Sequence, residues 1–205
     1  MTILLVDDHA IVRAGLHRLL GALPAEIAEC ASGEEALALL AAQVPELVLL
    51  DLNLPGIGGL ELLRRLLRDH PGLNVLVLSM HAEPLYAARA LEAGARGYVS
   101  KNATPEELLT AVRRVARGGR YVEAEIAQEL AVQPAAPGNP LAALSERDME
   151  ILRLLACGRS LAEIGAGLSL SYKTVANSCS AIKAKLGVAR TAELVRLAIG
   201  LGLGG

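Results

Sequence analysis

In the first half of the chain, short runs of apolar residues alternate with longer segments whose apolar residues recur at helical spacing. This alternation predicts buried strands separated by amphipathic helices. The strands are expected to end at Val6, to cover 26–30, to end at Asp51 and at Ser79, and to lie around Tyr98. Helices are expected over 9–23, 32–42, 59–68 and 83–93, with a last one capped by Thr104. Five strands alternating with five helices predict an α/β fold with a doubly wound parallel sheet.

The pattern breaks over residues 118–143. Gly118-Gly119 ends the last helix, and residues 133–140 are rich in proline, alanine and glycine, which is typical of a linker. Within this stretch, residues 123–132 are expected to form a short helix. We therefore expect a first domain over residues 1–117, a linker over 118–143 and a second domain over 144–205.

The second domain shows only helical signals. A serine suited to capping a helix precedes each of three helical segments, at Ser145, Ser160 and Ser171. One side of the third segment carries apolar residues at i, i+4, i+7 and i+11, which are Val175, Cys179, Ile182 and Leu186. Two short helices joined by a tight turn predict a helix-turn-helix, whose second helix enters the major groove of DNA. We expect a small all-α helix-turn-helix domain.

Polar side chains follow four of the expected strands, namely Asp7, Asp8, Asp51, Ser79 and Lys101. The carboxyl ends of parallel strands meet at one edge of a sheet, so these groups are expected to converge there. Three clustered carboxylates repel one another unless a hard cation neutralises them, and oxygen ligands of this kind favour Mg²⁺, which phosphate oxygens often complete. A phosphoryl group is therefore the expected ligand, with Asp51 as nucleophile and Lys101 offsetting the developing charge.

These residues resemble the receiver domain of two-component response regulators, which has a flavodoxin-like fold, and the resemblance covers residues 1–117. It implies that a sensor histidine kinase phosphorylates Asp51 and that Mg²⁺ is the cofactor. By the same resemblance, Asp8 and Asp51 bind Mg²⁺ directly, Asp7 binds it through water, and the backbone carbonyl of Asn53 is a further ligand.

The resemblance also assigns the residues that respond to phosphorylation. Ser79 and Lys101 are expected to contact the phosphoryl group. Tyr98 matches the switch aromatic that turns inward when Ser79 moves, although a half-buried strand tyrosine is also consistent with this position. Leu54 and Gly58 depart from the usual receiver pattern without removing an expected ligand.

In the second domain, segments 144–148, 173–175 and 185–188 resemble the LuxR-type DNA-binding domain, so the whole chain is similar to NarL/FixJ-type response regulators. The resemblance makes the third helix the recognition helix, with these residues toward DNA: Lys173, Thr174, Ala176, Asn177, Ser180, Lys183 and Lys185. The amide of Asn177 suits bidentate pairing with adenine. The lysines are suited to contacting phosphates, and such contacts position a protein on DNA without reading its sequence.

Composition narrows the remaining possibilities. The formal net charge is −2, so the sequence as a whole does not indicate nucleic-acid binding. With 53% hydrophobic residues but no Trp and no Phe, the core has to be aliphatic. Three scattered cysteines suit a reducing compartment. The N-terminal apolar run is too short for a signal peptide and no run is long enough for a membrane span, so a cytoplasmic protein is expected.

The expected function is phosphorylation-controlled, sequence-specific binding to double-stranded DNA, with a homodimer as the phosphorylated form. The chain is not expected to be an enzyme beyond assisting its own phosphoryl transfer and dephosphorylation. Two alternatives stay open. Ala176 and Ser178 replace residues that favour DNA contact in relatives, which leaves an interaction protein with weak or lost DNA binding. A phosphoaspartyl hydrolase is the other, although no segment is an obvious source of the second acid that it needs.

Overall fold

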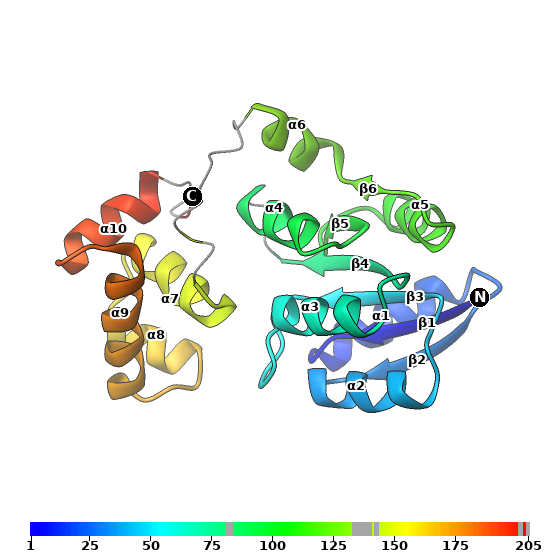
Figure 1. Ribbon diagram of the computed structural model, residues 1–205, viewed down its shortest axis with the longest axis horizontal. Helices are drawn as coiled ribbons and strands as arrows, with labels where there is room; N and C mark the ends of the chain where they lie inside the picture. The colour runs from blue at the N-terminus through cyan, green and yellow to red at the C-terminus, as the bar shows by residue number, and fades with distance from the viewer. Residues whose placement is uncertain (81–83, 133–140, 142–143, 201–202, 204–205) are drawn as a thin grey trace. The chain divides into compact units, whose positions relative to one another are not determined.

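The computed structural model describes residues 1–80, 84–132, 141, 144–200 and 203. They fall into two units, Met1–Pro134 and Ala135–Gly205, shown in Figure 1. The proline-rich stretch over 133–140 and the expected helix start at residue 83 lie outside the described residues.

The first unit is built on a parallel sheet with the strand order β2-β1-β3-β4-β5-β6. The strands are β1 (Thr2–Val6), β2 (Glu26–Cys30), β3 (Leu47–Asp51), β4 (Asn74–Ser79), β5 (Gly97–Ser100) and β6 (Tyr121–Val122). In the register, Asp51 pairs with Leu78 and Ser79 pairs with Ser100, so the ends of β3, β4 and β5 are level. This register brings the residues that follow these strands to one edge of the sheet.

Helices cover both faces of this sheet. They are α1 (Ala10–Leu20), α2 (Gly33–Ala42), α3 (Gly59–Asp69), α4 (Pro84–Glu92), α5 (Pro105–Ala116) and α6 (Ala124–Val132). Contacts join α2 to α3 and α3 to α4 on one side, and α1 to α5 on the other. The predicted doubly wound α/β fold is confirmed. Helix α1 ends at Leu20 rather than at residue 23, because Gly21 forms its C-cap and Leu23 turns back into the core.

The core is mostly aliphatic, as the composition predicts, although Tyr86 and Tyr98 are also buried. Alternate residues of the central strands pack with α1 and α5 in one cluster, which includes Leu5, Leu49, Leu76 and Val112. Since both faces are covered, every residue of β3 is buried, and the strand has a continuous apolar sequence up to Asp51.

Two elements of the first unit lie in the stretch that the sequence assigns to the linker. Strand β6 pairs with the edge of β5. Helix α6 follows β6 and contacts α4, and its residue Ile126 is buried. Helix α6 confirms the short helix that the sequence predicts. Strand β6 is not predicted by the sequence, because two residues are too few to show an alternating pattern.

The second unit consists of α7 (Glu146–Ala156), α8 (Leu161–Gly167), α9 (Tyr172–Leu186) and α10 (Thr191–Gly200). The hydroxyls of Ser145, Ser160 and Ser171 each accept the backbone N–H three residues ahead, as their capping role predicts. Three residues of the predicted stripe on α9 are buried, while Leu186, at the helix end, is half-buried. Among the described residues, none of the helices has the length and apolar character to cross a bilayer.

Gly165 lies inside α8, where a glycine costs about 1 kcal/mol relative to alanine. Its backbone carbonyl accepts the N–H of Leu170 at 2.8 Å, and a Cβ at this position would lie 2.8 Å from the carbonyl oxygen of the same leucine. The tight turn between α8 and α9 therefore requires glycine at residue 165. A Cβ at Gly167 would meet nothing within 4 Å, so no close contact requires glycine at this second position.

Candidate functional site

The residues that the sequence singles out in the first unit lie together at the carboxyl edge of the sheet. Asp7 follows β1, Asp51 ends β3, Ser79 ends β4 and Lys101 follows β5. The backbone N–H of Lys101 donates to the carbonyl of Ser79 at 2.8 Å, which fixes the ends of β4 and β5 to each other. Asp7, Asp51 and Ser79 are each at most 1% exposed.

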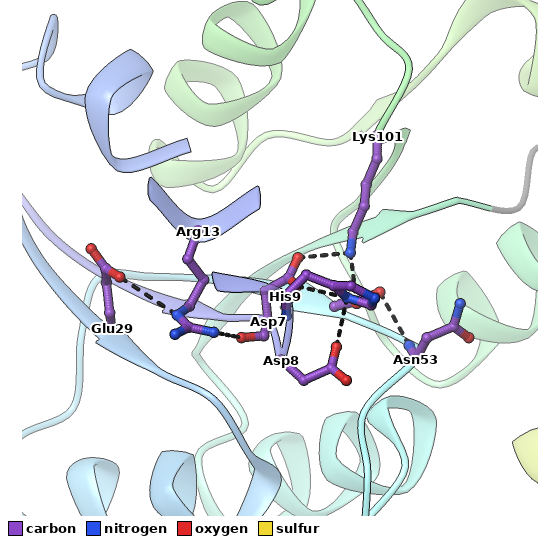
Figure 2. A network of polar contacts seen from close by, with 8 residues as sticks. Asp7, Asp8, His9, Arg13, Glu29, Asn53 and Lys101 are labelled. Carbon is purple, nitrogen blue, oxygen red and sulfur yellow. Dashed lines mark hydrogen bonds and ion pairs between the residues drawn. The ribbon is translucent and has the colours of Figure 1, made fainter. Parts of the chain in front are cut away.

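A buried ammonium group joins two of the acids. The Nζ atom of Lys101 lies 2.6 Å from Asp51 Oδ2 and 2.7 Å from Asp7 Oδ2, and the lysine side chain is only 6% exposed. Figure 2 shows Lys101 reaching into the cluster beside Asp7. One cation thus compensates two buried carboxylates, and the site keeps an excess of negative charge.

Burial raises the pKa of the Asp51 carboxyl above its usual value, because the charged form loses hydration, and the nearby charge of Asp7 adds to the rise. Lys101 opposes this shift by its charge and its hydrogen bond. The backbone N–H of Asn53 donates to Asp51 Oδ1 at 3.1 Å and also favours the carboxylate. The pKa remains raised, so the ionised form is held at a net electrostatic cost.

The donor set suits a hard cation. Asp7, Asp8, His9 and Asp51 each offer one ligand atom, and these atoms all lie within 4.8 Å of one another. An octahedral Mg²⁺ holds oxygens at about 2.1 Å, so opposite ligands stand about 4.2 Å apart. The observed spread therefore needs only a small contraction. Asp8 is exposed to solvent, which leaves that side of the cluster accessible.

His9 is a member of this cluster that the sequence analysis does not single out. Its Nδ1 lies 2.8 Å from Asp8 Oδ1, and its backbone N–H donates to Asp7 Oδ1 at 2.8 Å. Its place directly after the two aspartates is the signal that would have indicated it. The hydrogen bond from the backbone N–H of His9 orients the Asp7 carboxylate.

A second group of residues supports Asp7 from the side of α1. Arg13 donates through a terminal nitrogen to the carbonyl of Asp7 at 2.6 Å, and its Nε lies 3.6 Å from Glu29 Oε2. His17, one turn further along α1, pairs with Glu29 of β2. Figure 2 shows Arg13 between Asp7 and Glu29. No local motif predicts this support, because Glu29 comes from a different strand.

Tyr98 lies in the middle of β5 and is fully buried. The alternative of a half-buried strand tyrosine therefore does not describe this ring, and the role of Tyr98 as a switch stays a prediction. Val122 of β6 is its neighbour in the sheet.

The expected DNA-facing residues all lie on α9. Lys173, Thr174, Asn177 and Ser180 are exposed, whereas Ala176 and Lys183 are half-buried. Tyr172, which the sequence analysis does not single out, is 62% exposed at the first position of the helix. An exposed aromatic directly after the capping Ser171 is the signal that would have indicated it.

Lys185 has a partner within its own unit. Its Nζ lies 2.6 Å from Asp148 Oδ2, and the same carboxylate accepts the backbone N–H of Ser145 in the capping box of α7. The end of α9 is thereby tied to the start of α7. Lys185 has to leave this carboxylate before it can reach a phosphate.

Both units match known families. The response regulator receiver domain matches residues 3–113, and the bacterial regulatory proteins of the luxR family match residues 142–198. The chain is 46% identical over 211 residues to the transcriptional activator protein ExaE of Pseudomonas putida, covering 99% of this chain and 98% of ExaE. It is 38% identical over 208 residues to the response regulator UvrY of Escherichia coli K12, covering 99% of this chain and 95% of UvrY.

Solved structures agree. A two-component response regulator of the LuxR family from Aurantimonas sp. SI85-9A1 is 40% identical with a TM-score of 0.61, covering 63% of this chain and 94% of that one. RcsB from Salmonella enterica serovar Typhimurium, bound to promoter P1flhDC in the presence of the phosphomimetic BeF3−, is 26% identical with a TM-score of 0.61 and covers 96% of both chains. The chain therefore belongs to the two-component response regulators of the NarL/FixJ type, in which a receiver domain precedes a LuxR-type DNA-binding domain.

Proposed function

We propose that Asp51 accepts a phosphoryl group from a sensor histidine kinase and that its phosphorylation controls the binding of α9 to double-stranded DNA. The observation that carries this proposal is the buried Asp51 carboxylate, held 2.6 Å from the Lys101 ammonium beside the carboxylate of Asp7. Few structural roles require two buried acids at one cation, because uncompensated buried charge is costly.

In the transfer step, a carboxylate oxygen of Asp51 forms a bond to phosphorus while the bond between phosphorus and the imidazole nitrogen of the kinase phosphohistidine breaks. The imidazole leaves with the electron pair of that bond and takes up a proton. Lys101 offsets the charge on the equatorial oxygens, and the hydroxyl of Ser79 contacts one of them. The chain assists its own phosphorylation and dephosphorylation and is otherwise not an enzyme in this proposal.

Asp8, Asp51 and the backbone carbonyl of Asn53 would hold Mg²⁺, with Asp7 acting through a water molecule. When bound, the ion neutralises the excess negative charge of the cluster and of the incoming phosphoryl group. The support for this assignment is the close grouping of hard oxygen donors at the solvent-accessible side of Asp8.

On the DNA side, Asn177 reads a base edge from the exposed face of α9, while Lys173, Lys183 and Lys185 contact phosphates. Thr174, Ala176 and Ser180 complete the surface that faces the groove. We add Tyr172 to this set, because its exposed ring stands at the N-terminal end of the recognition helix. The phosphorylated chain acts as a homodimer on paired half-sites, as solved RcsB dimers are bound to DNA. We expect the protein to act in the cytoplasm.

The first test measures the response to phosphodonor. Beryllofluoride with Mg²⁺ is expected to raise the melting temperature of the wild-type chain, since a ligand that binds only the folded state stabilises it. Asp51→Asn is expected to abolish the response, and Asp8→Asn is expected to raise the Mg²⁺ concentration that the response requires. An unaltered response in the Asp51 variant would remove that residue from its role.

The second test measures DNA binding. Duplexes enriched from a random pool, with and without beryllofluoride, are titrated over a salt series, and binding is expected to fall steeply with salt because phosphate contacts release counterions. Negligible, salt-independent binding by the beryllofluoride form would favour the interaction protein that has lost DNA affinity. Steady turnover of a small phosphate ester would instead favour the hydrolase.

A further inference from the structure

Strand β5 lies between β4, which ends at Ser79, and β6, which begins the segment that leads to the second unit. It carries Tyr98 and ends at Ser100, directly before Lys101. On one side, the N–H of Lys101 donates to β4 through the carbonyl of Ser79. On the other side, β5 pairs with β6, from which α6 runs toward the end of the first unit at Pro134.

The ladder between β5 and β6 ends in an unusual way. Glu123 donates its backbone N–H to the carbonyl of Tyr98 at 3.3 Å, so the next bond of a parallel ladder would run from the N–H of Ser100 to the carbonyl of Glu123. That carbonyl instead accepts the N–H of Ala127 at 2.9 Å, in the first turn of α6. The side chain replaces it, since Glu123 Oε2 accepts the N–H of Ser100 at 2.8 Å.

Glu123 therefore serves two elements at once. Its backbone carbonyl begins α6, and its carboxylate completes the ladder at the residue before Lys101. Ser100 is only 5% exposed, so its N–H would lack an acceptor without this carboxylate. Hydrogen bonds to ionised acceptors are among the stronger ones in proteins. Helix α6 contacts α4 and is anchored by the buried Ile126, so a displacement at its first turn moves a packed helix.

We propose that Glu123 is a positioning residue that couples the end of β5, and with it Lys101, to α6, and so transmits the phosphorylation state of Asp51 to the segment that leads to the DNA-binding unit. The proposal rests on the proposed function. When the phosphoryl group arrives, Lys101 gives up its shared position between Asp51 and Asp7. The shift passes through the Ser100 backbone to the Glu123 carboxylate and to the start of α6.

The test is hydrogen–deuterium exchange of the full chain, read over peptides that cover 124–132, with Mg²⁺ alone and with Mg²⁺ and beryllofluoride. In the wild type, beryllofluoride is expected to change the exchange rates of α6 by about fivefold, a typical lower bound for coupled sites. In Glu123→Ala, the change is expected to fall below about twofold. The melting temperature, measured in parallel, still rises with beryllofluoride because the phosphoacceptor site is intact.

Two variants make the test specific. Glu123→Gln keeps an oxygen that accepts from Ser100 and is expected to restore most of the response. Glu125→Ala removes the same charge from an exposed position in the same helix turn and is expected to behave as the wild type. A merely structural role of Glu123 would change the basal exchange of α6 but leave its ratio with and without beryllofluoride unchanged.

The outcomes separate the two proposals. If Glu123→Ala keeps the wild-type ratio, or if beryllofluoride stabilises the wild type without changing exchange in α6, the coupling is overturned and the role of Asp51 stands. If beryllofluoride does not stabilise the wild type at all, the proposed phosphoacceptor fails, and the coupling fails with it.

Discussion

Each unit of the chain contains a lysine that lies 2.6 Å from a carboxylate, but the two pairs differ in their surroundings. In the receiver, Lys101 is 6% exposed and its partner Asp51 is fully buried. In the DNA-binding unit, Lys185 is 39% exposed and Asp148 is 10% exposed. Equal distances therefore do not mean that the two ion pairs have equal interaction free energies, because solvent screens the Lys185–Asp148 pair much more than the Lys101–Asp51 pair.

This difference has a functional meaning. Lys101 is too buried for solvent to replace its carboxylates readily, so the receiver holds these charges in place before a ligand brings new charge. Lys185 can exchange Asp148 for another anion at small cost. The first pair is fixed by burial, whereas the second is solvated enough to rearrange.

The largest effect is expected for Lys101→Met in the absence of Mg²⁺. Two buried carboxylates lose the ammonium group that lies within 2.7 Å of both, which is expected to lower the free energy of unfolding by about 3–5 kcal/mol. The loss should shrink at acidic pH, where Asp51 takes up a proton, and when Mg²⁺ is added. Urea denaturation across pH and Mg²⁺ concentration measures it. A loss below about 1 kcal/mol would place this pair in the same class as the exposed one.

The DNA-binding unit is expected to be most sensitive at its backbone rather than at its charges. Gly165→Ala places a methyl group against the carbonyl of Leu170 and is expected to cost about 1–3 kcal/mol. Gly167→Ala meets open space and is expected to gain up to about 1 kcal/mol. Thermal denaturation of the two variants compares them directly, and equal effects would contradict the close approach at the turn.

Asp51→Asn is expected to stabilise the receiver at neutral pH without Mg²⁺, because the asparagine carries no charge to bury. Because the folded-state pKa of Asp51 is raised, its contribution to stability is fully present below the unfolded value of 3.8 and is lost as pH rises through the folded value. The gain from the asparagine should therefore be largest at neutral pH and vanish near pH 3.8. Denaturation of both proteins over this pH range checks the sign. A constant gain would point to packing rather than to charge.

The smallest effects are expected on α9. Lys185→Met should cost less than about 1 kcal/mol of stability, since the pair is partly solvated. Lys173→Gln removes an exposed lysine that is expected to contact phosphate, so the slope of log affinity against log salt should fall by about 1. Lys185→Met should change that slope less, because Lys185 first has to leave Asp148. Equal changes in slope would make the two lysines equivalent in DNA binding.

The sequence predicts features that follow from local pattern better than contacts between distant residues. The convergence of Asp7, Asp51 and Lys101 follows from where each stands relative to its strand, since a parallel sheet aligns those ends. The helix caps of the second unit follow from serines at fixed spacing. Both predictions depend on local pattern and on one rule of topology.

The contacts that the sequence does not predict join residues far apart in the chain or elements too short to show a pattern. Arg13 meets Glu29 across a helix and a strand, and Lys185 meets Asp148 from 37 positions away. Strand β6 has two residues, and its neighbour Glu123 reads as an ordinary surface acid. Such contacts are selected by tertiary packing, which local propensity does not encode.

The burial of Tyr98 and the exposure of Tyr172 have a practical consequence. The chain has no Trp and no Phe, so its four tyrosines are the whole of its intrinsic near-ultraviolet emission. An aqueous quencher such as iodide reaches the ring at the start of α9 and not the ring within β5. Quenching of the unlabelled protein by iodide is thus weighted toward Tyr172 and away from the buried Tyr98.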